Sequence, residues 1–420
     1  SCRQTIIEHV FSNSYGSPYV GAYTPPVGCN FTTTIFNLSV TSQGRQYDRL
    51  ALLYFGDIEV WRTSTAMPTQ SGIHWSFQKD MTVFHSILST EQKVIFDLAN
   101  VIDGNLYTGA FDVNLEALYF DDDYTAGFFP AEEIYPISLL SSADNATSVF
   151  SLPGDSGSVN VTLPRNIKTA VVSLMASGNG AEEFWYTNVP SEYTNTFNSP
   201  WGLLNGYGPF REVQLLIDGQ LAGVSWPFPI LFTGGVDPGA WRPIVGIDTY
   251  DLPSFEIDVT PWLYLLCDGN EHSFQLQVIG FDATAPGLIG PIGQNWWVSG
   301  SLFVWLDHAT NQTVAGLKST SGSGPAFDFN SNINKVIEPN GTVTNSSLYF
   351  SLEAHRSLSI SSTIQAANGS SRTVTWEQNL SFINTQTVTN QALNQSSTMV
   401  TEGSHLGSAS NIVSNYKYPI

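Results

Sequence analysis

Carboxylates beside aromatic rings are the residues in this chain best suited to chemistry. Asp48 lies between Tyr47 and Arg49 at the start of an apolar run, and Glu182 and Glu183 are followed by three aromatic residues. Carboxylates can serve as acid and base, and aromatic faces stack on sugar rings. The combination favours a carbohydrate site, although a single Asp-Arg pair at a strand end more often forms a salt bridge.

Other catalytic motifs are missing from the sequence. It has no Gly-x-Ser-x-Gly segment, no phosphate-binding loop and no histidine pair with zinc spacing. The acidic run 121–123 could offer oxygen ligands to a metal. Its spacing fits no known calcium loop, so a solvated loop is the favoured interpretation. We therefore predict neither a metal nor a cofactor.

The bulk composition limits the classes of partner. The chain has 420 residues, 42% hydrophobic and 12% charged, with a formal net charge of -21. Negative charge over most of the surface would repel a polyanion. Nucleic acid is therefore excluded as a partner, and binding to anionic membranes is disfavoured. No run of about 18 apolar residues is present that could span a membrane.

The cysteines and glycosylation signals indicate a secreted protein. Cys2 and Cys29 could close an N-terminal loop, which leaves Cys267 either to pair outside the chain or to remain a free buried thiol. The start at Ser1 is typical of a processed mature protein. Asn-x-Ser/Thr signals support a eukaryotic secretory route and lie at Asn30, Asn37, Asn145, Asn160, Asn311, Asn340, Asn345, Asn368, Asn379 and Asn394.

The elements that must position these residues are short strands. Apolar runs such as 50–55 and 213–217 end in Gly, Asp or Asn, which are hairpin signals. Amphipathic helical stretches with caps are nearly absent. Regular spacing of such runs predicts antiparallel sandwiches or jelly rolls.

An internal repeat divides the chain. The segment 80–96 begins Asp-Met-Thr-Val-Phe, and the segment 258–274 begins Asp-Val-Thr-Pro-Trp with the same internal spacing. We therefore predict an all-β chain with two tandem jelly-roll-like antiparallel β-sandwich domains, 1–152 and 160–308. Residues 309–420 are predicted to form a further C-terminal β region that is incomplete at its end.

Several motifs in one order resemble those of the peptide N-glycanase A family, the acidic glycoamidases of plants and fungi. They are Tyr-Asp-Arg at 47–49, Arg-Thr-Ser-Thr-Ala at 62–66, Glu-Phe-Trp-Tyr at 183–186, Pro-Phe-Arg-Glu-Val at 209–213, Trp-Pro-Phe at 226–228 and Thr-Gly-Gly at 233–235. The resemblance implies hydrolysis of the amide between an Asn side chain and the first N-acetylglucosamine of an N-glycan. The products would be Asp and a glycosylamine.

A fainter resemblance reaches the bacterial peptide N-glycanase F, which is built of two jelly rolls. Its catalytic aspartate lies in a Trp-Asp-Arg segment, to which residues 47–49 are similar. Asp97 stands where that enzyme has a second acidic residue. Its third carboxylate is similar to Glu183, with Glu182 and Glu212 as alternatives.

The two resemblances imply a role for each candidate. Asp48 would activate the attacking group, and Arg49 or Arg62 would donate to the carbonyl oxygen. Glu183 and Asp97 would bind the sugar and the peptide. The implied substrate-binding set is Arg49, Arg62, Trp61, Trp75, Glu182, Trp185, Arg211, Glu212, Trp226 and Trp241.

The expected partners are N-glycosylated peptides or proteins, and a second chain cut from the same precursor could be joined through Cys267. The expected location is extracellular or an acidic secretory compartment of a eukaryote, by our interpretation a fungus. Two other functions remain open. One is a glycan-binding sandwich without catalysis, and the other is a glycoside hydrolase that uses a carboxylate pair.

Overall fold

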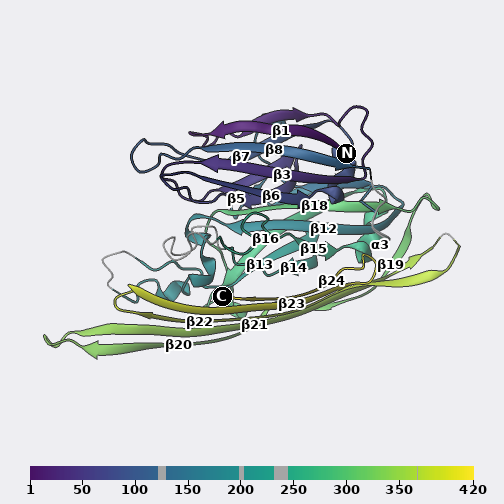
Figure 1. The fold of residues 1–420 in the computed structure, drawn as a ribbon. Coiled ribbons are helices and arrows are strands. Elements are labelled where there is room, and N and C mark those ends of the chain that lie inside the picture. The colour runs from purple at the N-terminus through teal and green to yellow at the C-terminus, as the bar shows by residue number, and fades with distance from the viewer. Residues whose placement is uncertain (122–128, 198–202, 231–244, 367) are drawn as a thin grey trace.

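Two β-sandwiches and one long β-sheet are stacked in this protein. The computed structural model describes residues 1–121, 129–197, 203–230, 245–366 and 368–420. In Figure 1 a purple and blue sandwich lies uppermost, a teal and green sandwich follows, and a long green and yellow sheet lies below them. The all-β prediction is confirmed.

The described helices are single turns of three or four residues. They are η1 (Thr82–Phe84), α1 (His85–Leu88), η2 (Ser142–Asp144), η3 (Gly180–Glu182), η4 (Trp185–Thr187), η5 (Ser191–Tyr193), η6 (Thr260–Trp262), α3 (Leu263–Leu266) and η7 (Pro286–Leu288). None of the helices in the described ranges is long and apolar enough to cross a membrane.

The first sandwich has the strand order of a jelly roll. One sheet contains β1 (Cys2–Phe11), β8 (Phe111–Phe120), β3 (Thr33–Ser42) and β6 (Ile73–Asp80), and the other contains β2 (Tyr19–Tyr23), β7 (Gln92–Leu98), β4 (Leu50–Phe55) and β5 (Ile58–Ser64). Burial alternates along β3 and β8, because successive side chains of a strand point to opposite faces. The buried set, which includes Phe36 and Leu115, fills the core between the sheets.

The second sandwich repeats this order. One sheet contains β10 (Phe150–Leu152), β18 (Trp296–Leu306), β12 (Ile167–Gly178) and β15 (Phe255–Asp258), and the other contains β11 (Ser158–Thr162), β16 (Glu271–Phe281), β13 (Arg211–Ile217) and β14 (Gln220–Ser225). Two strands are added at the sides: β9 (Glu133–Ile137) pairs with β18, and β17 (Ile289–Gly290) pairs with β16. Without these two, both sandwiches have the order 1-8-3-6 facing 2-7-4-5, so the two predicted jelly rolls are confirmed.

The sequence repeat marks the same corner in both sandwiches. Asp80 and Asp258 end equivalent strands, and each accepts a 2.9 Å hydrogen bond from the backbone N–H of the threonine two residues later. A 3-10 turn and a one-turn helix follow in each case and lead into the opposite sheet. The repeated Asp-x-Thr therefore caps the turn that carries the chain between sheets.

The C-terminal region forms one long sheet. Its order is β19 (Val314–Gly322), β21 (Val343–Gln365), β22 (Ser371–Thr389), β23 (Asn394–Gly407) and β24 (Val413–Pro419), with β20 (Ala326–Ile337) also paired to β21. Leu352, Trp376 and Phe382 on its inner face belong to the same hydrophobic core as the second sandwich. The long sheet and the second sandwich therefore stabilise each other.

The chain enters the second sandwich earlier than predicted. β9 and β10 lie within the range 1–152 assigned to the first domain, yet both pair with β18. An apolar strand pattern says which face is buried but not which sheet the strand completes. The last described strand of the first sandwich is β8.

The cysteines follow one of the two predicted arrangements. A disulfide joins Cys2 and Cys29, with 6.4 Å between their Cα atoms. Cys267 is unpaired and 2% exposed, inside the core of the second sandwich. Its burial favours the free-thiol alternative over a bridge to another chain.

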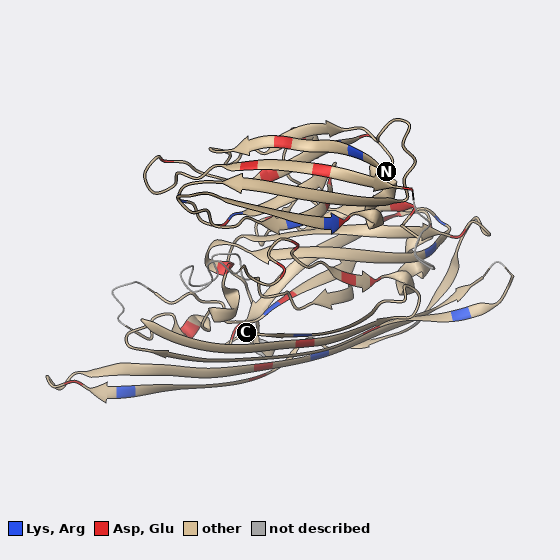
Figure 2. Cartoon of the chain, viewed as in Figure 1, with Lys and Arg blue, Asp and Glu red and all other residues tan. Residues whose placement is uncertain are grey.

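Charge is sparse in all three layers. Figure 2 shows acidic residues spread over both sandwiches and the long sheet, with fewer basic ones between them. Of the ten asparagines in glycosylation signals, eight are exposed, whereas Asn37 and Asn345 are half-buried. Those eight side chains lie where a modifying enzyme could reach them.

Candidate active site

The candidate site lies where the two sandwiches meet. Leu52, Tyr54 and Ile95 of the first sandwich form an apolar cluster that packs against Val149 and Trp297. In Figure 1 β18, which carries Trp297, lies on the side of the second sandwich that faces the first. This contact fixes one sandwich against the other, and with it the loops at the end of the interface.

A buried ion pair of the first sandwich is bonded to the second sandwich at the same interface. Arg62 is 1% exposed and donates two hydrogen bonds, of 2.7 and 2.8 Å, to Glu59. Its Nη1 donates to the Ser177 hydroxyl at 2.9 Å and to the Trp297 carbonyl at 2.8 Å, both in the second sandwich. The Tyr54 hydroxyl donates to Glu59 at 3.0 Å. Arg62 thus holds the sandwiches together, which corrects its predicted role as a donor to substrate.

Asp48 and Glu183 come together from different sandwiches. Asp48 is half-buried just before β4, and Glu183 is half-buried directly after η3, in the loop that leaves β12. Burial, and secondarily the negative charge of Asp48, raises the pKa of Glu183 to about 7. The tertiary structure therefore unites two of the three predicted carboxyls.

Asp97 lies on the sheet face that is turned towards the second sandwich. It is opposite Leu52 in the β4–β7 pair, and Leu52 is opposite Arg62 in the β4–β5 pair, so the three share one face. Burial raises the pKa of Asp97 to about 6, and its Oδ1 has no hydrogen-bond partner in the described part of the chain. A buried polar atom without a partner costs stability, which points to a role in binding.

Arg49 keeps one donor unused beside Asp48. Its backbone N–H donates to Thr65 Oγ1 at 2.9 Å, and its Nη2 donates to Gln46 Oε1 at 2.8 Å. The guanidinium lies over the ring of Tyr107, with 5.7 Å from Cζ to the ring centroid. Its Nε is buried without a hydrogen-bond partner among the described residues. This donor can serve a ligand.

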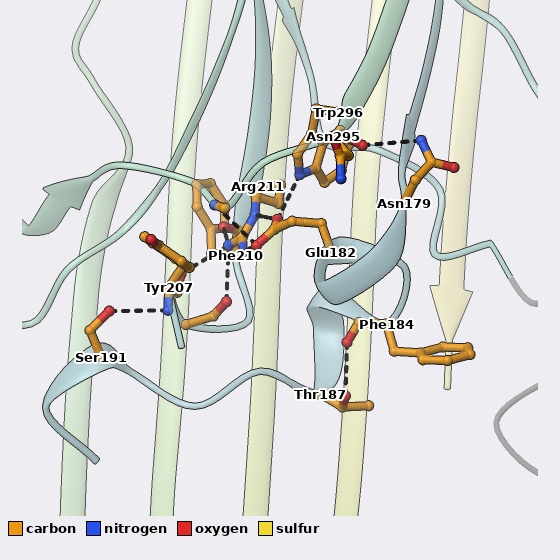
Figure 3. Close-up of polar contacts among 12 residues, drawn as sticks. Asn179, Glu182, Phe184, Thr187, Ser191, Tyr207, Phe210, Arg211, Asn295 and Trp296 are labelled. Carbon is orange, nitrogen blue, oxygen red and sulfur yellow. Dashed lines mark hydrogen bonds and ion pairs between the residues drawn. The ribbon is translucent and has the colours of Figure 1, made fainter. Parts of the chain in front are cut away.

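The alternative carboxylate Glu182 is fully engaged, as Figure 3 shows. It is 0% exposed and accepts hydrogen bonds of 2.6 and 2.7 Å from Arg211. It also accepts from the Trp296 indole at 2.6 Å and from the Gly293 backbone N–H at 3.1 Å. Glu182 and Arg211 are therefore structural, which corrects their predicted role in substrate binding.

Glu212, the other alternative, is engaged in the same way. It is buried and accepts from the Trp226 indole at 2.9 Å, from the Gln214 amide at 2.6 Å and from Arg356 of β21. It therefore anchors the long sheet and is not placed to bind substrate as predicted. Of the three candidates for this carboxyl, Glu183 remains.

Most of the tryptophans predicted to contact sugar lie in the core. The buried ones are Trp61, Trp185 and Trp226, with exposed fractions of 1%, 3% and 1%. The prediction is wrong for these three, because their large apolar area stabilises the protein more inside a sandwich than at its surface. Trp75 is half-buried and stacks on Tyr250 with 6.0 Å between ring centroids. Trp241 lies outside the described residues.

A connection from the second sandwich, which the sequence pattern did not indicate, borders the site. The segment 249–252 lies between β14 and β15 and covers the edge of β5. The Ser64 backbone N–H donates to the Thr249 carbonyl, and the Trp61 indole donates to the Tyr250 carbonyl, both at 2.9 Å. Such pairing depends on the fold and has no signature in a loop sequence.

Comparison with known proteins identifies relatives of this chain. The family model described as Peptide N-acetyl-beta-D-glucosaminyl asparaginase amidase A matches residues 1–323, and the model described as PNGase_A C-terminal domain matches residues 349–420. Peptide-N4-(N-acetyl-beta-glucosaminyl)asparagine amidase A of Prunus dulcis is 34% identical over 341 residues, which are 76% of this chain and 57% of the relative. The chain thus spans somewhat more than half the length of that relative.

Solved structures were also matched. PNGase F, a glycosylasparaginase from Flavobacterium meningosepticum, has a TM-score of 0.43 at 13% identity, over 73% of this chain and 96% of that one. A structure of PNGF-II has a TM-score of 0.46 at 14% identity, over 73% of this chain and 65% of that one.

The ion pair between the sandwiches yields a stability prediction. Arg62→Met leaves the Glu59 charge buried without its partner, and the free energy of unfolding should fall by about 3–5 kcal/mol. The double variant Glu59→Gln with Arg62→Met should recover much of that loss, because no charge is left buried. Urea unfolding of both variants measures this, and a loss below about 1 kcal/mol in the single variant would contradict it.

The electrostatic interaction between Asp48 and Glu183 yields a pKa prediction. Asp48→Asn removes a negative charge, so Glu183 ionises more readily and its pKa should fall from about 7 by about half a unit or more. It should stay above its ordinary value of 4.5, because burial is the larger cause. NMR titration of the glutamate carboxyls measures the shift, and an unchanged value would show that the carboxyls do not interact.

Proposed function

Because the chain belongs to the peptide N-acetyl-beta-D-glucosaminyl asparaginase amidase A family, we propose that it hydrolyses the amide between an asparagine side chain and the first N-acetylglucosamine of an N-glycan. Its substrates are N-glycosylated peptides or proteins, and its products are a peptide with Asp at that position and a glycosylamine. The observation that carries the proposal is the meeting of Asp48 and Glu183 at the junction of the sandwiches.

The carboxyl pair matches what amide hydrolysis requires. The reaction needs a base for the attacking water and an acid for the leaving nitrogen, and two carboxyls in different environments can divide these tasks. Glu183, with a pKa of about 7, is protonated in acidic solution and donates its proton to the nitrogen. Asp48 accepts a proton from water as the water oxygen bonds to the carbonyl carbon. The carbon–nitrogen bond then breaks.

Arg49 and Asp97 complete the site. Negative charge develops on the carbonyl oxygen during the attack, and a preorganised donor stabilises it. The unpartnered Nε of Arg49 can supply that hydrogen bond. The unpartnered Oδ1 of Asp97 can accept a hydroxyl of the sugar. Both groups offer a substrate what the described part of the protein does not use.

Secretion is part of the proposal. The Cys2–Cys29 disulfide needs an oxidising compartment, and the exposed Asn-x-Ser/Thr signals suit passage through the secretory route. Location in an acidic secretory compartment would keep Glu183 protonated. A second chain bound through Cys267 would require the core to open around a buried thiol, so a bridge at that residue is not proposed.

The proposal is tested by replacing Asp48. Asp48→Asn should lower kcat/KM for glycan release from a denatured glycopeptide by at least about 100-fold, because the base is removed. Asp112→Asn makes the same change at an exposed position of β8 and should leave kcat/KM unchanged. Glycan release by Asp48→Asn at the wild-type rate would sink the assignment.

The product separates this function from its rivals. Conversion of Asn to Asp adds about one mass unit to the peptide at each site. A glycoside hydrolase would instead leave one sugar on Asn. Binding of glycopeptide without any change in peptide mass would identify a lectin-like protein.

A further inference from the structure

The loop that carries Glu183 is fixed firmly where it leaves β12. The Asn179 backbone N–H donates to the Asn295 carbonyl at 3.0 Å, and the Asn179 side-chain amide donates to the same carbonyl at 3.1 Å. Glu182 then holds the first turn through its bonds to Arg211 and Trp296, all of which Figure 3 shows. Glu183 is the next residue, so its backbone position is set on this side by the second sandwich.

The segment that follows Glu183 is held by the long C-terminal sheet. The carbonyls of Tyr186, Thr187 and Asn188 each accept hydrogen bonds from side-chain amides of β22 or β23. These are Asn384 to Tyr186 at 2.9 Å, Gln386 to Tyr186 at 3.1 Å, Gln386 to Asn188 at 3.4 Å and Gln395 to Thr187 at 2.6 Å. Three consecutive carbonyls of the second sandwich therefore depend on a sheet that is remote in sequence.

The two buried amides are unusual for their position. Asn384 and Gln386 are each 0% exposed on the inner face of β22, between the apolar Phe382 and Val388 of the same face. Burying an amide costs free energy unless its groups are bonded. Here Gln386 donates to the Asn384 oxygen at 2.9 Å and accepts from Gln395 at 2.7 Å. Apolar residues would fill this face without the free-energy cost of burying an amide. The function of the two amides is therefore to bond the loop that follows Glu183.

We infer that Asn384 and Gln386 are positioning residues that hold the Glu183 loop in its working geometry, so that the C-terminal sheet is part of the active site. The inference rests on the proposed function, because it assigns the sheet to the same site. Neither residue is assigned a contact with substrate. They act by fixing the carbonyls that follow Glu183.

Loss of these amides has a defined consequence for Glu183. A relaxed loop exposes the Glu183 carboxyl to water and moves it away from the charge of Asp48. Burial and that charge are the two causes that raise the pKa of Glu183, so its pKa should fall. The double variant Asn384→Leu with Gln386→Met should therefore lower kcat about 10-fold or more while KM changes less than about 3-fold. The limb of the pH–rate profile that reports Glu183 should move to lower pH by about half a unit or more.

Hydrogen exchange gives a readout that does not need activity. Amides within residues 180–190 should exchange faster in the double variant, because the loop opens more often. If the wild-type chain released no glycan, the proposed function would fail, but the exchange of this segment would still test the positioning. Wild-type exchange together with a wild-type pH profile in the double variant would overturn the inference.

Gln378→Met provides a matched control on the same strand. Gln378 is also buried, and its amide bonds both the backbone N–H and the carbonyl of Val224, at 2.9 and 2.7 Å, on the edge strand β14. This variant also replaces a buried amide by an apolar side chain, yet it should leave kcat, the pH profile and the exchange of 180–190 unchanged. Equal changes in both variants would mean that the sheet supports the fold only.

A single exposed change covers the case in which the double variant does not fold. Gln395→Ala removes the hydrogen bond to the Thr187 carbonyl from an exposed side chain, so folding should survive. It should produce smaller shifts in the same direction in kcat, in the pH profile and in exchange. No change in any of the three would count against the inference.

Discussion

The buried pair of Glu59 and Arg62 is the interaction on which the candidate site depends. An isolated charge in an interior is costly, and it is tolerated only where partners satisfy it. Arg62 meets this condition by bonding Glu59 in its own sandwich and the Ser177 hydroxyl and Trp297 carbonyl in the other. One side chain therefore bonds the two facing sheets to each other. The relative position of the loops beyond the interface depends on this bonding. These loops carry Asp48 on one side and Glu183 on the other.

The number of hydrogen-bond donors around each carboxyl separates the structural carboxyls from the candidate catalytic ones. Glu59, Glu182 and Glu212 are buried and each is paired with an arginine, and in each case further hydrogen bonds reach another element. Asp97 and Glu183 have no such pairing with the described residues, and burial raises the pKa of both. A protein with few basic residues thus places several arginines beside carboxylates in the core. The carboxyls left over are those able to gain or lose a proton near neutral pH.

The equivalent corners of the two jelly rolls differ in what they contact. Asp80 and Asp258 cap equivalent turns, but only Asp258 has the long sheet beside it. Its Oδ2 accepts from the Ser410 backbone N–H at 3.1 Å and from the Ser410 hydroxyl at 2.7 Å. Together with Glu212 and Gln378, this residue attaches the C-terminal sheet to the second sandwich. The first sandwich has no such covering sheet in the described ranges and meets the second sandwich instead.

The sequence by itself determined the local features, because strand periodicity, turn residues, the Asp-x-Thr repeat and the nearby cysteine pair act over short stretches of chain. It also singled out Asp48 and the pair Glu182 and Glu183. Only the tertiary structure decided between those two glutamates, which are neighbours with identical chemistry. One turns into the core and meets Arg211, and the other meets Asp48 across the interface. The same holds for β9 and β10, which completed a sheet that the pattern did not predict. Partners distant in the chain decide such outcomes, since a side chain's pKa and bonds come from what folding packs against it.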